Sequence, residues 1–484
     1  MNTAFADRFQ FEQGEGYEQG AYDQLSAQPT TFNWTRQTSL SGPSKPEEKW
    51  TNSISSDPSS PVLSADGSIY VLEQATANLL AFDSEGNKKW AVLSNANQAP
   101  WWYSPVVGKN GTIYYGEESG VFHAVSSEGK KLWDFDANMN IYNSSAIGAN
   151  GTIFFTGLTA LFALNPDGTL LWKYSPGSAE FKWSTPVIAK DGTIIIGANE
   201  VLQNELVGGV LFAVNPDGTL KWMKKFEDKK ANRYFKISTV PVLDENGDIY
   251  VSLDYGDAEN PELKDKIFAL DLDGNTKWKY TLNDGEGALH SSPIVDKNGT
   301  IYVPGNKRLY AFNKDGKKKW MIKIPIHSLS TPIIDNDGIL YFGGVDQAIY
   351  AVNAKTGQVK WRHQTDMYIT SAPVIDRDQS LLFTSEKYDD GKLVKLGNKE
   401  KEVIGLQAES DSVQLKLNEK RQLKIVAIYD DETTEDVTAK ASWSSSYTKV
   451  VTVEKGLLTA IDTGKVFIKA KYGGQTIAIT VNVR

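Results

Sequence analysis

One short frame recurs along this chain and constrains its fold more than any other feature. It reads Ala-x-[Asp/Asn/Ser]-x-x-Gly-x-x-x-Trp, and its last copy carries one extra residue. The copies occupy residues 81–90, 124–133, 163–172, 213–222, 269–278, 311–320 and 351–361. Repeats spaced about 40 to 56 residues apart indicate that one supersecondary unit is stacked many times.

Each repeat predicts four short antiparallel strands, here called A to D. Strand A is a Pro-Val-Ile type run, strand B an Ile-Tyr-Val type run, strand C a Leu-Phe-Ala-Leu type run, and strand D carries the tryptophan. Asn-Gly and Asp-Gly pairs favour tight hairpins because both residues tolerate positive φ. They stand between strands A and B at Asp66-Gly67, Asn110-Gly111, Asn150-Gly151, Asp191-Gly192, Asn246-Gly247, Asn298-Gly299 and Asp337-Gly338. Four antiparallel strands per repeat are typical of a β-propeller blade.

The number of strands predicts how the ring closes. Eight sets of strands A to C can be counted, and eight strand D tryptophans. Trp50 has no A–C set before it, and the last set, at about 371–396, has no tryptophan after it. We therefore expect an all-β fold, an eight-bladed β-propeller in which the strand of Trp50 completes the last blade and leaves no open sheet edge.

Composition excludes several classes of function. The 484 residues hold 51 Lys and Arg against 60 Asp and Glu, a net charge of −9, which argues against nucleic acid and anionic membranes as partners. The chain has no cysteine, so disulfides, thiolate chemistry and Cys-ligated metals are excluded. No apolar run approaches the roughly 20 residues of a membrane-spanning helix. Motifs for a nucleophile elbow, a P-loop, a dinucleotide fingerprint or a zinc protease are also missing.

The tryptophan frame resembles the repeat of quinoprotein-like, PQQ-type β-propellers. The similarity covers about residues 33–398, including the entry segment Trp34-Thr35-Arg36. In that family the tryptophan docks between neighbouring blades. The resemblance therefore implies a structural, blade-docking role for Trp50, Trp90, Trp133, Trp172, Trp222, Trp278, Trp320 and Trp361.

A second resemblance covers about residues 403–484. Alternating strands here accompany the strings Asp436-Val437-Thr438, Trp443-Ser444-Ser445-Ser446 and Gly456-Leu457-Leu458-Thr459-Ala460. These are similar to the bacterial group 2 immunoglobulin-like (BIG2) domain, a β-sandwich common in stalks of surface proteins. Residues 399–402 are expected to be a charged linker, and residues 1–32 a flexible leader.

Aromatic side chains gather in the D-to-A connections, at the predicted mouth of the central channel. Aromatic side chains around a concavity offer a large contact area at low entropic cost. Candidate ligand-binding residues are Trp101, Trp102, Tyr142, Trp183, Tyr234, His290 and Tyr368, with Tyr103, Phe181, Phe235 and His327 nearby. Trp102 and Trp183 stand three residues before a strand A proline, and we expect both to be partly exposed. The alternative is that these rings fill gaps between blades.

Metal sites are weakly indicated. The B–C insertion at 252–267 holds Asp254, Asp257, Glu259, Glu262 and Asp265, hard oxygen ligands for calcium or simply a solvated acidic loop. A second B–C insertion, at 197–210, is expected to be irregular. His290, His327 and His363 all precede strand A, but on three different blades, so no metal triad is expected. His123 fills a slot that other repeats give to Phe or Tyr and is expected to be structural.

These features together predict a monomeric bacterial protein that is secreted or held at the cell surface, although the chain shows no intact signal peptide. Its expected role is that of a non-catalytic binding or scaffold protein that recognises an extracellular protein or polysaccharide through the loop-rich propeller face, with the Ig-like domain as spacer or attachment module. A scaffold like the propeller lipoprotein of the outer-membrane assembly machinery is one alternative, although the chain has no cysteine for lipidation. The other alternative is an enzyme, quinoprotein dehydrogenase-like or polysaccharide lyase-like. The dehydrogenases typically carry a vicinal cysteine pair on the cofactor, so in this cysteine-free chain neither PQQ nor another cofactor is expected.

Overall fold

The structure is a computed structural model, and it describes most of the chain. The described residues are 38–55, 57–73, 76–94, 104–182, 184–202, 205–228, 233–254, 265–282, 291–327, 330–387, 390–430 and 432–484. They form two compact units, with the boundary between Asn398 and Lys399. The described residues contain strands, turns and bends, and among them no helix is long and apolar enough to cross a membrane. The predicted all-β class is confirmed.

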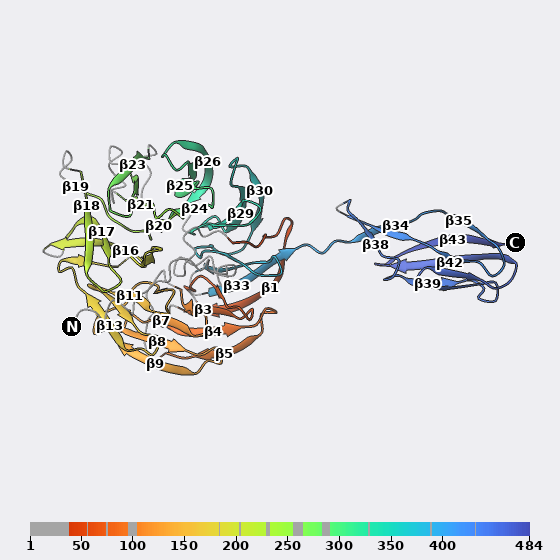
Figure 1. Ribbon diagram of the computed structural model, residues 1–484, viewed down its shortest axis with the longest axis horizontal. Helices are drawn as coiled ribbons and strands as arrows, with labels where there is room; N and C mark the ends of the chain where they lie inside the picture. The colour runs from red at the N-terminus through yellow and green to blue at the C-terminus, as the bar shows by residue number, and fades with distance from the viewer. Residues whose placement is uncertain are drawn as a thin grey trace. The chain divides into compact units, whose positions relative to one another are not determined.

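Within its described residues, the first unit consists of eight antiparallel sheets that follow one another around a ring (Figure 1). We number the sheets in chain order. Sheet 1 holds β2–β5, sheet 2 β6–β9, sheet 3 β10–β13, sheet 4 β14–β19, sheet 5 β20–β23, sheet 6 β24–β26, sheet 7 β27–β30, and sheet 8 β31–β33 with β1. In sheet 2, β7, β8 and β9 lie progressively farther from the ring centre (Figure 1).

The two inner strands of each sheet are largely buried. The A strands are β2 (Val62–Leu63), β6 (Val106–Val107), β10 (Ala146–Ile147), β15 (Val187–Ile188), β20 (Val242–Leu243), β24 (Ile294–Val295), β27 (Ile333–Ile334) and β31 (Val374–Ile375). The B strands are β3 (Ile69–Glu73), β7 (Ile113–Gly116), β11 (Ile153–Gly157), β16 (Ile194–Leu202), β21 (Ile249–Leu253), β28 (Ile339–Gly344) and β32 (Leu381–Lys387). Sheet 6 differs, because β25 (Ile301–Phe312) supplies both its B and its C positions.

The C strands are about as buried as the B strands, whereas the D strands at the rim are more exposed. The remaining C strands are β4 (Asn78–Phe82), β8 (Val121–Val125), β12 (Ala160–Leu164), β17 (Glu205–Val214), β22 (Lys266–Leu270), β29 (Ala348–Asn353) and β33 (Asp390–Asn398). The D strands are β5 (Lys88–Val92), β9 (Lys131–Asp136), β13 (Leu170–Tyr174), β18 (Leu220–Asp228), β23 (Thr276–Thr281), β26 (Lys318–His327), β30 (Val359–Gln364) and β1 (Pro46–Ser55). The expected irregular insertion at 197–210 is instead paired strand, because β16 and β17 extend their hairpin from Ile194↔Val214 to Leu202↔Glu205. Two short strands, β14 (Ala179–Glu180) and β19 (Arg233–Tyr234), add to sheet 4.

Eight tryptophans tie neighbouring sheets together. Each indole Nε1–H donates to a backbone carbonyl in the segment that leads into the outermost strand of the next sheet, at 2.8 to 3.2 Å. The pairs are Trp50 with Ser84, Trp90 with Ser127, Trp133 with Pro166, Trp172 with Pro216, Trp222 with Leu272, Trp278 with Lys314, Trp320 with Ala354 and Trp361 with Pro43. The frame's glycine is required where the indole rests. At Gly218, with φ +87°, an added Cβ would come within 2.7 Å of the Trp172 ring.

The apolar core lies between the sheets. Each neighbouring pair of sheets shares one cluster of buried side chains, and these clusters run around the whole ring. The cluster that joins sheet 8 to sheet 1 contains Leu382 and Leu393 beside Ile69 and Val71. The ring is therefore held mainly by burial of apolar surface at its seams.

Strand β1 closes the ring. It pairs antiparallel with β33 from Pro46↔Asn398 to Ser55↔Asp390, with one irregularity between Glu48 and Trp50. The N-terminal strand therefore forms the outer edge of a sheet whose other three strands come from residues 374–398. The hydrogen bond of Trp361 joins sheet 7 to sheet 8, and that of Trp50 joins sheet 8 to sheet 1.

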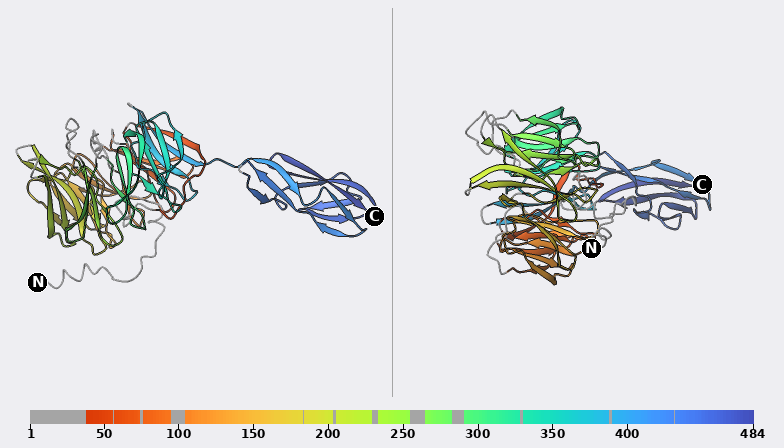
Figure 2. Two further views of the ribbon diagram at one scale, coloured as in Figure 1. Left: turned by 90° about the horizontal axis from the view of Figure 1, so that it is seen from above. Right: turned by 60° about the vertical axis from the view of Figure 1, so that its left-hand side comes forward.

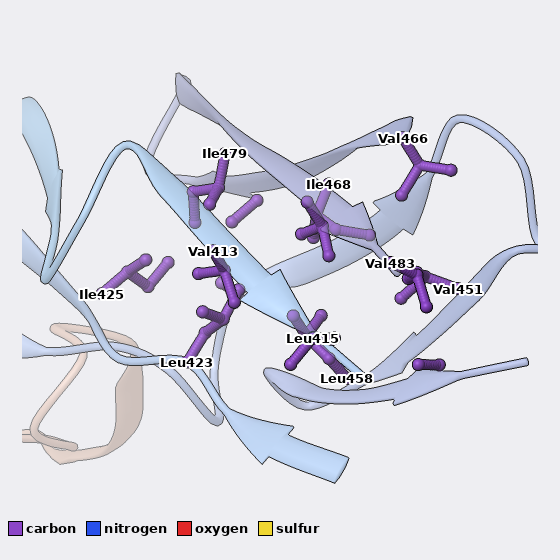
Figure 3. Packing of buried hydrophobic residues seen from close by; sticks show 14 of the residues in the cluster. Val413, Leu415, Leu423, Ile425, Val451, Leu458, Val466, Ile468, Ile479 and Val483 are labelled. Atoms are coloured by element: carbon purple, nitrogen blue, oxygen red, sulfur yellow. The ribbon is translucent and has the colours of Figure 1, made fainter. Parts of the chain in front are cut away.

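Within its described residues, the second unit contains ten strands, β34–β43, shown in blue in Figure 2. They are β34 (Val403–Ala408), β35 (Ser412–Leu415), β36 (Lys420–Gln422), β37 (Ile425–Tyr429), β38 (Thr434–Asp436), β39 (Ser442–Ser445), β40 (Val451–Glu454), β41 (Leu457–Ala460), β42 (Gly464–Tyr472) and β43 (Gln475–Val483). They form sheets with the orders β34-β37-β38, β35-β43-β42-β39 and β36-β41-β40. These sheets enclose a buried cluster that includes Val413, Ile425, Leu458, Ile468 and Val483 (Figure 3).

Candidate functional site: the connection face of the ring

The ring has two different faces. On one face lie the tight A–B turns, which are held by lysines of the D strands: Lys89 Nζ donates to Ser68 Oγ at 2.6 Å. On the other face, D-to-A connections pair with the ends of B strands, at Pro58↔Glu73, Ile141↔Gly157, Lys236↔Asp254 and Tyr368↔Glu386. We call this second side the connection face. It is the side on which the candidate aromatic residues were predicted.

Buried isoleucines fix several connections. Ile141, Ile237 and Ile369 are almost completely buried. Ile141 lies on Gly116 and Ile237 on Gly197, each glycine being in the B strand of the sheet that the connection leaves. A Cβ added at either glycine would come within 2.5 Å of the isoleucine Cγ2. Only glycine leaves this space, so each connection is held between the sheet it leaves and the sheet it enters.

Two predicted ligand-binding residues, Tyr142 and Tyr368, stand beside these anchors. Tyr142 follows Ile141, Tyr368 precedes Ile369, and both tyrosines are partly exposed. The ammonium of Lys182 lies 5.5 Å from the centre of the Tyr142 ring. Burial, and then the nearby Glu118 carboxylate, raise the pKa of Tyr142, which therefore stays a neutral phenol. Ile141 and Ile369 thus each hold an adjacent tyrosine ring in a defined place.

A carboxylate pair lies next to Tyr368. Thr370 Oγ1 donates to Glu386 Oε1 at 2.8 Å, and Glu386 also pairs through its backbone with Tyr368. Burial, and then the nearby Asp57 carboxylate, raise the pKa of Glu386. Asp57 itself has φ +51°, in the left-handed region. Within the described part of the chain neither carboxylate forms an ion pair, so the site offers two acids without a paired cation.

His123 is buried between acids and is inaccessible to a ligand. Its Nδ1 lies 2.7 Å from Asp134 Oδ1, and its Nε2 lies 3.1 Å from Glu117 Oε1. Burial opposes ionisation of Glu117, yet the neighbouring His123 and a hydrogen bond from Ser94 lower its pKa. Both ring nitrogens face carboxylates, and the side chain is only 6% exposed, so this histidine has no nitrogen left for a metal.

Several predicted site residues fall outside the described residues: Trp101, Trp102, Trp183 and His290. Tyr234 lies in β19 and pairs with Glu227 of β18. Phe181 and Phe235 are buried in the clusters between sheets, so for these two rings the packing alternative is correct and a place at the mouth is wrong.

Histidines and acids do not converge on a metal centre in the described residues. His363 is half-buried in β30, where burial lowers its pKa, and His327 ends β26. Of the candidate calcium ligands, Asp254 and Asp265 are described, whereas Asp257, Glu259 and Glu262 are not. Among described residues no group of three or more His, Cys, Asp or Glu side chains is placed to hold a metal ion.

The side chains that could hold a cofactor do not match those expected around the quinone of the dehydrogenases. The resemblance to quinoproteins implies a vicinal cysteine pair and a calcium site, but the sequence has no cysteine, and the described acids form no cluster for calcium. We therefore assign the cofactor no role in this chain, and its absence stays a prediction.

Sequence reasoning missed two features of the ring. The carboxylate pair joins residues 57 and 386, which no local motif connects. Lys395, which is buried in β33, was also missed, although its position in the repeat marks it as unusual. It stands where each of the seven frames has alanine.

The sequence of this chain is similar to one protein family and to one curated protein. Residues 91–260 and 263–421 match the family described as outer membrane protein assembly factor BamB. The uncharacterized protein YxaL of Bacillus subtilis (strain 168) is 32% identical over 114 residues, which are 22% of this chain and 27% of that protein. The match therefore spans about a quarter of the length of that curated relative.

Solved structures share the fold at low identity. BamB from Moraxella catarrhalis has a TM-score of 0.56 and 15% identity, covering 73% of this chain and 99% of its own. The quinohemoprotein alcohol dehydrogenase from Comamonas testosteroni has a TM-score of 0.59 and 13% identity, covering 76% of this chain and 79% of its own. A europium-containing methanol dehydrogenase also scores 0.59 at 12% identity, covering 76% of this chain and 98% of its own.

These likenesses show a β-propeller shared by an outer membrane assembly factor and by dehydrogenases, so the fold alone does not decide the chemistry. The family match is more specific, because it covers more than half of the chain. This chain belongs to the outer membrane protein assembly factor BamB family of PQQ-like repeat proteins.

Proposed function

We propose that this protein is a non-catalytic, extracytoplasmic binding or scaffold protein that recognises a protein or glycan through the connection face. In this proposal the eight sheets are the blades of one propeller, closed by β1. The second unit is an immunoglobulin-like domain that serves as spacer or attachment module, and the protein acts as a secreted or surface-held monomer. The family description supports the extracytoplasmic location, since outer membrane assembly takes place outside the cytoplasm.

One observation carries this proposal: aromatic side chains are presented on fixed connections and differ from blade to blade. Tyr142 and Tyr368 are partly exposed, while the isoleucines beside them are buried and hold the backbone. A side chain needed only for packing would recur at each seam, as the docking tryptophan does. Rigid aromatic groups on a defined surface are typical anchors of a binding interface.

The carboxylate pair is the one observation that favours an enzyme. An acid with a raised pKa in a partly exposed site is a candidate general acid, as in a polysaccharide lyase or hydrolase. However, the two carboxyl groups of a hydrolase stand about 5–9.5 Å apart on either side of the reacting bond, whereas Asp57 is a hydrogen-bonding neighbour of Glu386. Neither acid forms an ion pair within the described residues, so no cation is paired with the acids to assist a lyase reaction. We therefore rank the enzyme second.

The proposal is tested by binding measurements on single variants of the full chain. Wild-type protein is screened on a peptide array and on a glycan array, and the strongest ligand is titrated by calorimetry. We expect Tyr142→Ala and Tyr368→Ala to weaken binding by about 2 kcal/mol each, as for an interface hot spot. Met223→Ala is the control, because Met223 is 54% exposed but lies in the outer strand β18. Affinity that responds to neither tyrosine would contradict a role for the connection face.

A further inference from the structure

The outer face of one sheet in the second unit carries lysines without acidic partners. In β42 the residues alternate, so that Val466, Ile468 and Ala470 point into the core while Lys465, Phe467, Lys469 and Lys471 are exposed. Figure 3 shows Val466 and Ile468 directed to the interior. Because successive strand residues point to opposite sides, all four exposed side chains share the outer face.

Strand pairing extends this face across the sheet. Lys465 pairs with Asn482, Phe467 with Thr480, Lys469 with Ala478 and Lys471 with Thr476. On the other side, Ser444 pairs with Lys469 and Ser442 with Lys471, and on the far edge Ser412 and Gln414 pair with Thr480 and Asn482. The cross-strand neighbours of the lysines are therefore neutral, and most of them carry hydrogen-bonding side chains.

Acidic side chains are segregated from this face. The ion pairs of the unit join Lys399 to Asp430, Lys424 to Asp436 and Lys440 to Glu435, around β37 and β38. Lys465, Lys469 and Lys471 form no ion pair within the described residues. Asp411 and Asp462 lie in the segments before β35 and β42 rather than within these strands. A patch of one sign of charge persists here although the whole chain has a net charge of −9.

We propose that the outer face of the sheet β35-β43-β42-β39 binds a linear acidic polysaccharide. The lysines supply positive charge for its carboxylates, and residues two apart on a strand are about 6.8 Å from each other, a spacing on the scale of a sugar unit. Phe467 is 46% exposed and offers a ring on which a sugar can stack, with Lys465 Nζ 5.7 Å from its centre. Serine, threonine, asparagine and glutamine supply donors and acceptors for hydroxyl groups.

The combination of charge, ring and hydroxyl-binding groups selects this partner over other polyanions. A polymer that offers charge alone would leave Phe467 and the neutral rows unused. The proposal concerns the second unit and does not rest on the function proposed for the connection face. It assigns a ligand to a unit for which the sequence indicates only a spacer or an attachment module.

The test compares variants of the full chain in binding to alginate, a uronate polymer, at low salt. We expect Lys469→Gln/Lys471→Gln to weaken binding roughly tenfold or more, since each lysine near a dense anionic ligand contributes about 1 kcal/mol. Phe467→Ala is expected to weaken it about threefold to tenfold, because a stacked ring is lost. All of these side chains are exposed, so the variants should melt at the temperature of the wild type.

The control is Lys420→Gln/Lys424→Gln, which removes the same charge from exposed positions away from this sheet. Alginate affinity that falls equally in both double variants would overturn the proposal, because binding would then follow net charge. Equal affinity for polyglutamate and alginate would overturn it as well, because no sugar ring would be recognised. Failure of alginate to bind while neutral dextran binds would contradict the role of the lysines.

Discussion

Lys395 is a charged side chain at a position that the seven repeat frames fill with alanine. It is 3% exposed, and its Nζ donates to Asp376 at 2.8 Å, to Asp378 at 2.9 Å and to the Ser84 carbonyl at 3.2 Å. Trp50 donates to the same carbonyl. Sheet 8, which the N-terminal strand completes, is therefore joined to sheet 1 by a buried ammonium as well as by its tryptophan.

We expect Lys395→Met to destabilise the first unit by about 3–5 kcal/mol, because it leaves Asp376 buried without its cation. The control is Lys131→Met, because the side chains of its ion pair with Asp134 are 51% and 39% exposed and the pair should contribute under about 1 kcal/mol. Denaturant unfolding followed by tryptophan fluorescence measures both. An equal decrease in the free energy of unfolding of the two variants would show that the buried ammonium of Lys395 does not stabilise the ring more than an exposed ion pair does.

Glu386 predicts a dependence of stability on pH. Its pKa is raised in the folded state, by burial and then by Asp57, so the folded chain binds this proton more tightly than the unfolded chain. The stability from the protonated acid is therefore fully present below the ordinary pKa of about 4.3, and it is lost as pH rises through the folded pKa. Glu386→Gln mimics the protonated acid and should raise the Tm at pH 7.5 but not at pH 4. Glu245→Gln, at an exposed position, should raise it at neither pH. A gain of the same size at both pH values would contradict the account of this pair.

Strands and turns could be predicted from the sequence where the backbone geometry at a position requires one particular residue type. Asp or Asn before glycine marked the A–B turns, and the tryptophan frame marked strands C and D. The hairpin of β16 and β17 was not predictable as strand, because Gly197, Gly208 and Gly209 weaken a strand pattern that only cross-strand pairing restores. The carboxylate pair was likewise unpredictable, since closure of the ring brings the connection that holds Asp57 next to Glu386 at the end of β32.

Close packing of the tryptophan on the neighbouring sheet can be tested with two glycines of similar backbone conformation. Gly218 and Gly67 have φ of +87° and +84°, but a Cβ at Gly218 would meet the Trp172 ring, whereas Gly67 has nothing within 4 Å. Gly67→Ala should cost only the left-handed strain, about 1–2 kcal/mol. Gly218→Ala should cost about 1–3 kcal/mol more, because the indole must move. Similar losses for both, measured by thermal unfolding, would mean that the tryptophan does not rest closely on the next sheet.

At the scale of the whole molecule, β1 holds the ring closed. Deleting residues 1–54 removes nearly all of β1 and Trp50, and it exposes the edge of β33 along its pairing with β1. We expect loss of cooperative unfolding, or aggregation through the open edge, in calorimetry and light scattering. Deleting residues 403–484 is the control, and it should leave the transition of the first unit nearly unchanged, because the two units have separate cores. A truncated ring that melts like the intact chain would contradict closure by β1.

The claim that this member of the family binds rather than catalyses is tested most directly with the cofactor of its dehydrogenase neighbours. The full chain is titrated with pyrroloquinoline quinone and calcium in a calorimeter and then assayed for dye-linked oxidation of alcohols and aldoses. Because the chain has no cysteine and its described acids form no calcium cluster, we predict no saturable heat and no turnover. Binding with a Kd in the micromolar range or tighter, accompanied by turnover, would contradict the account and make the chain a quinoprotein enzyme.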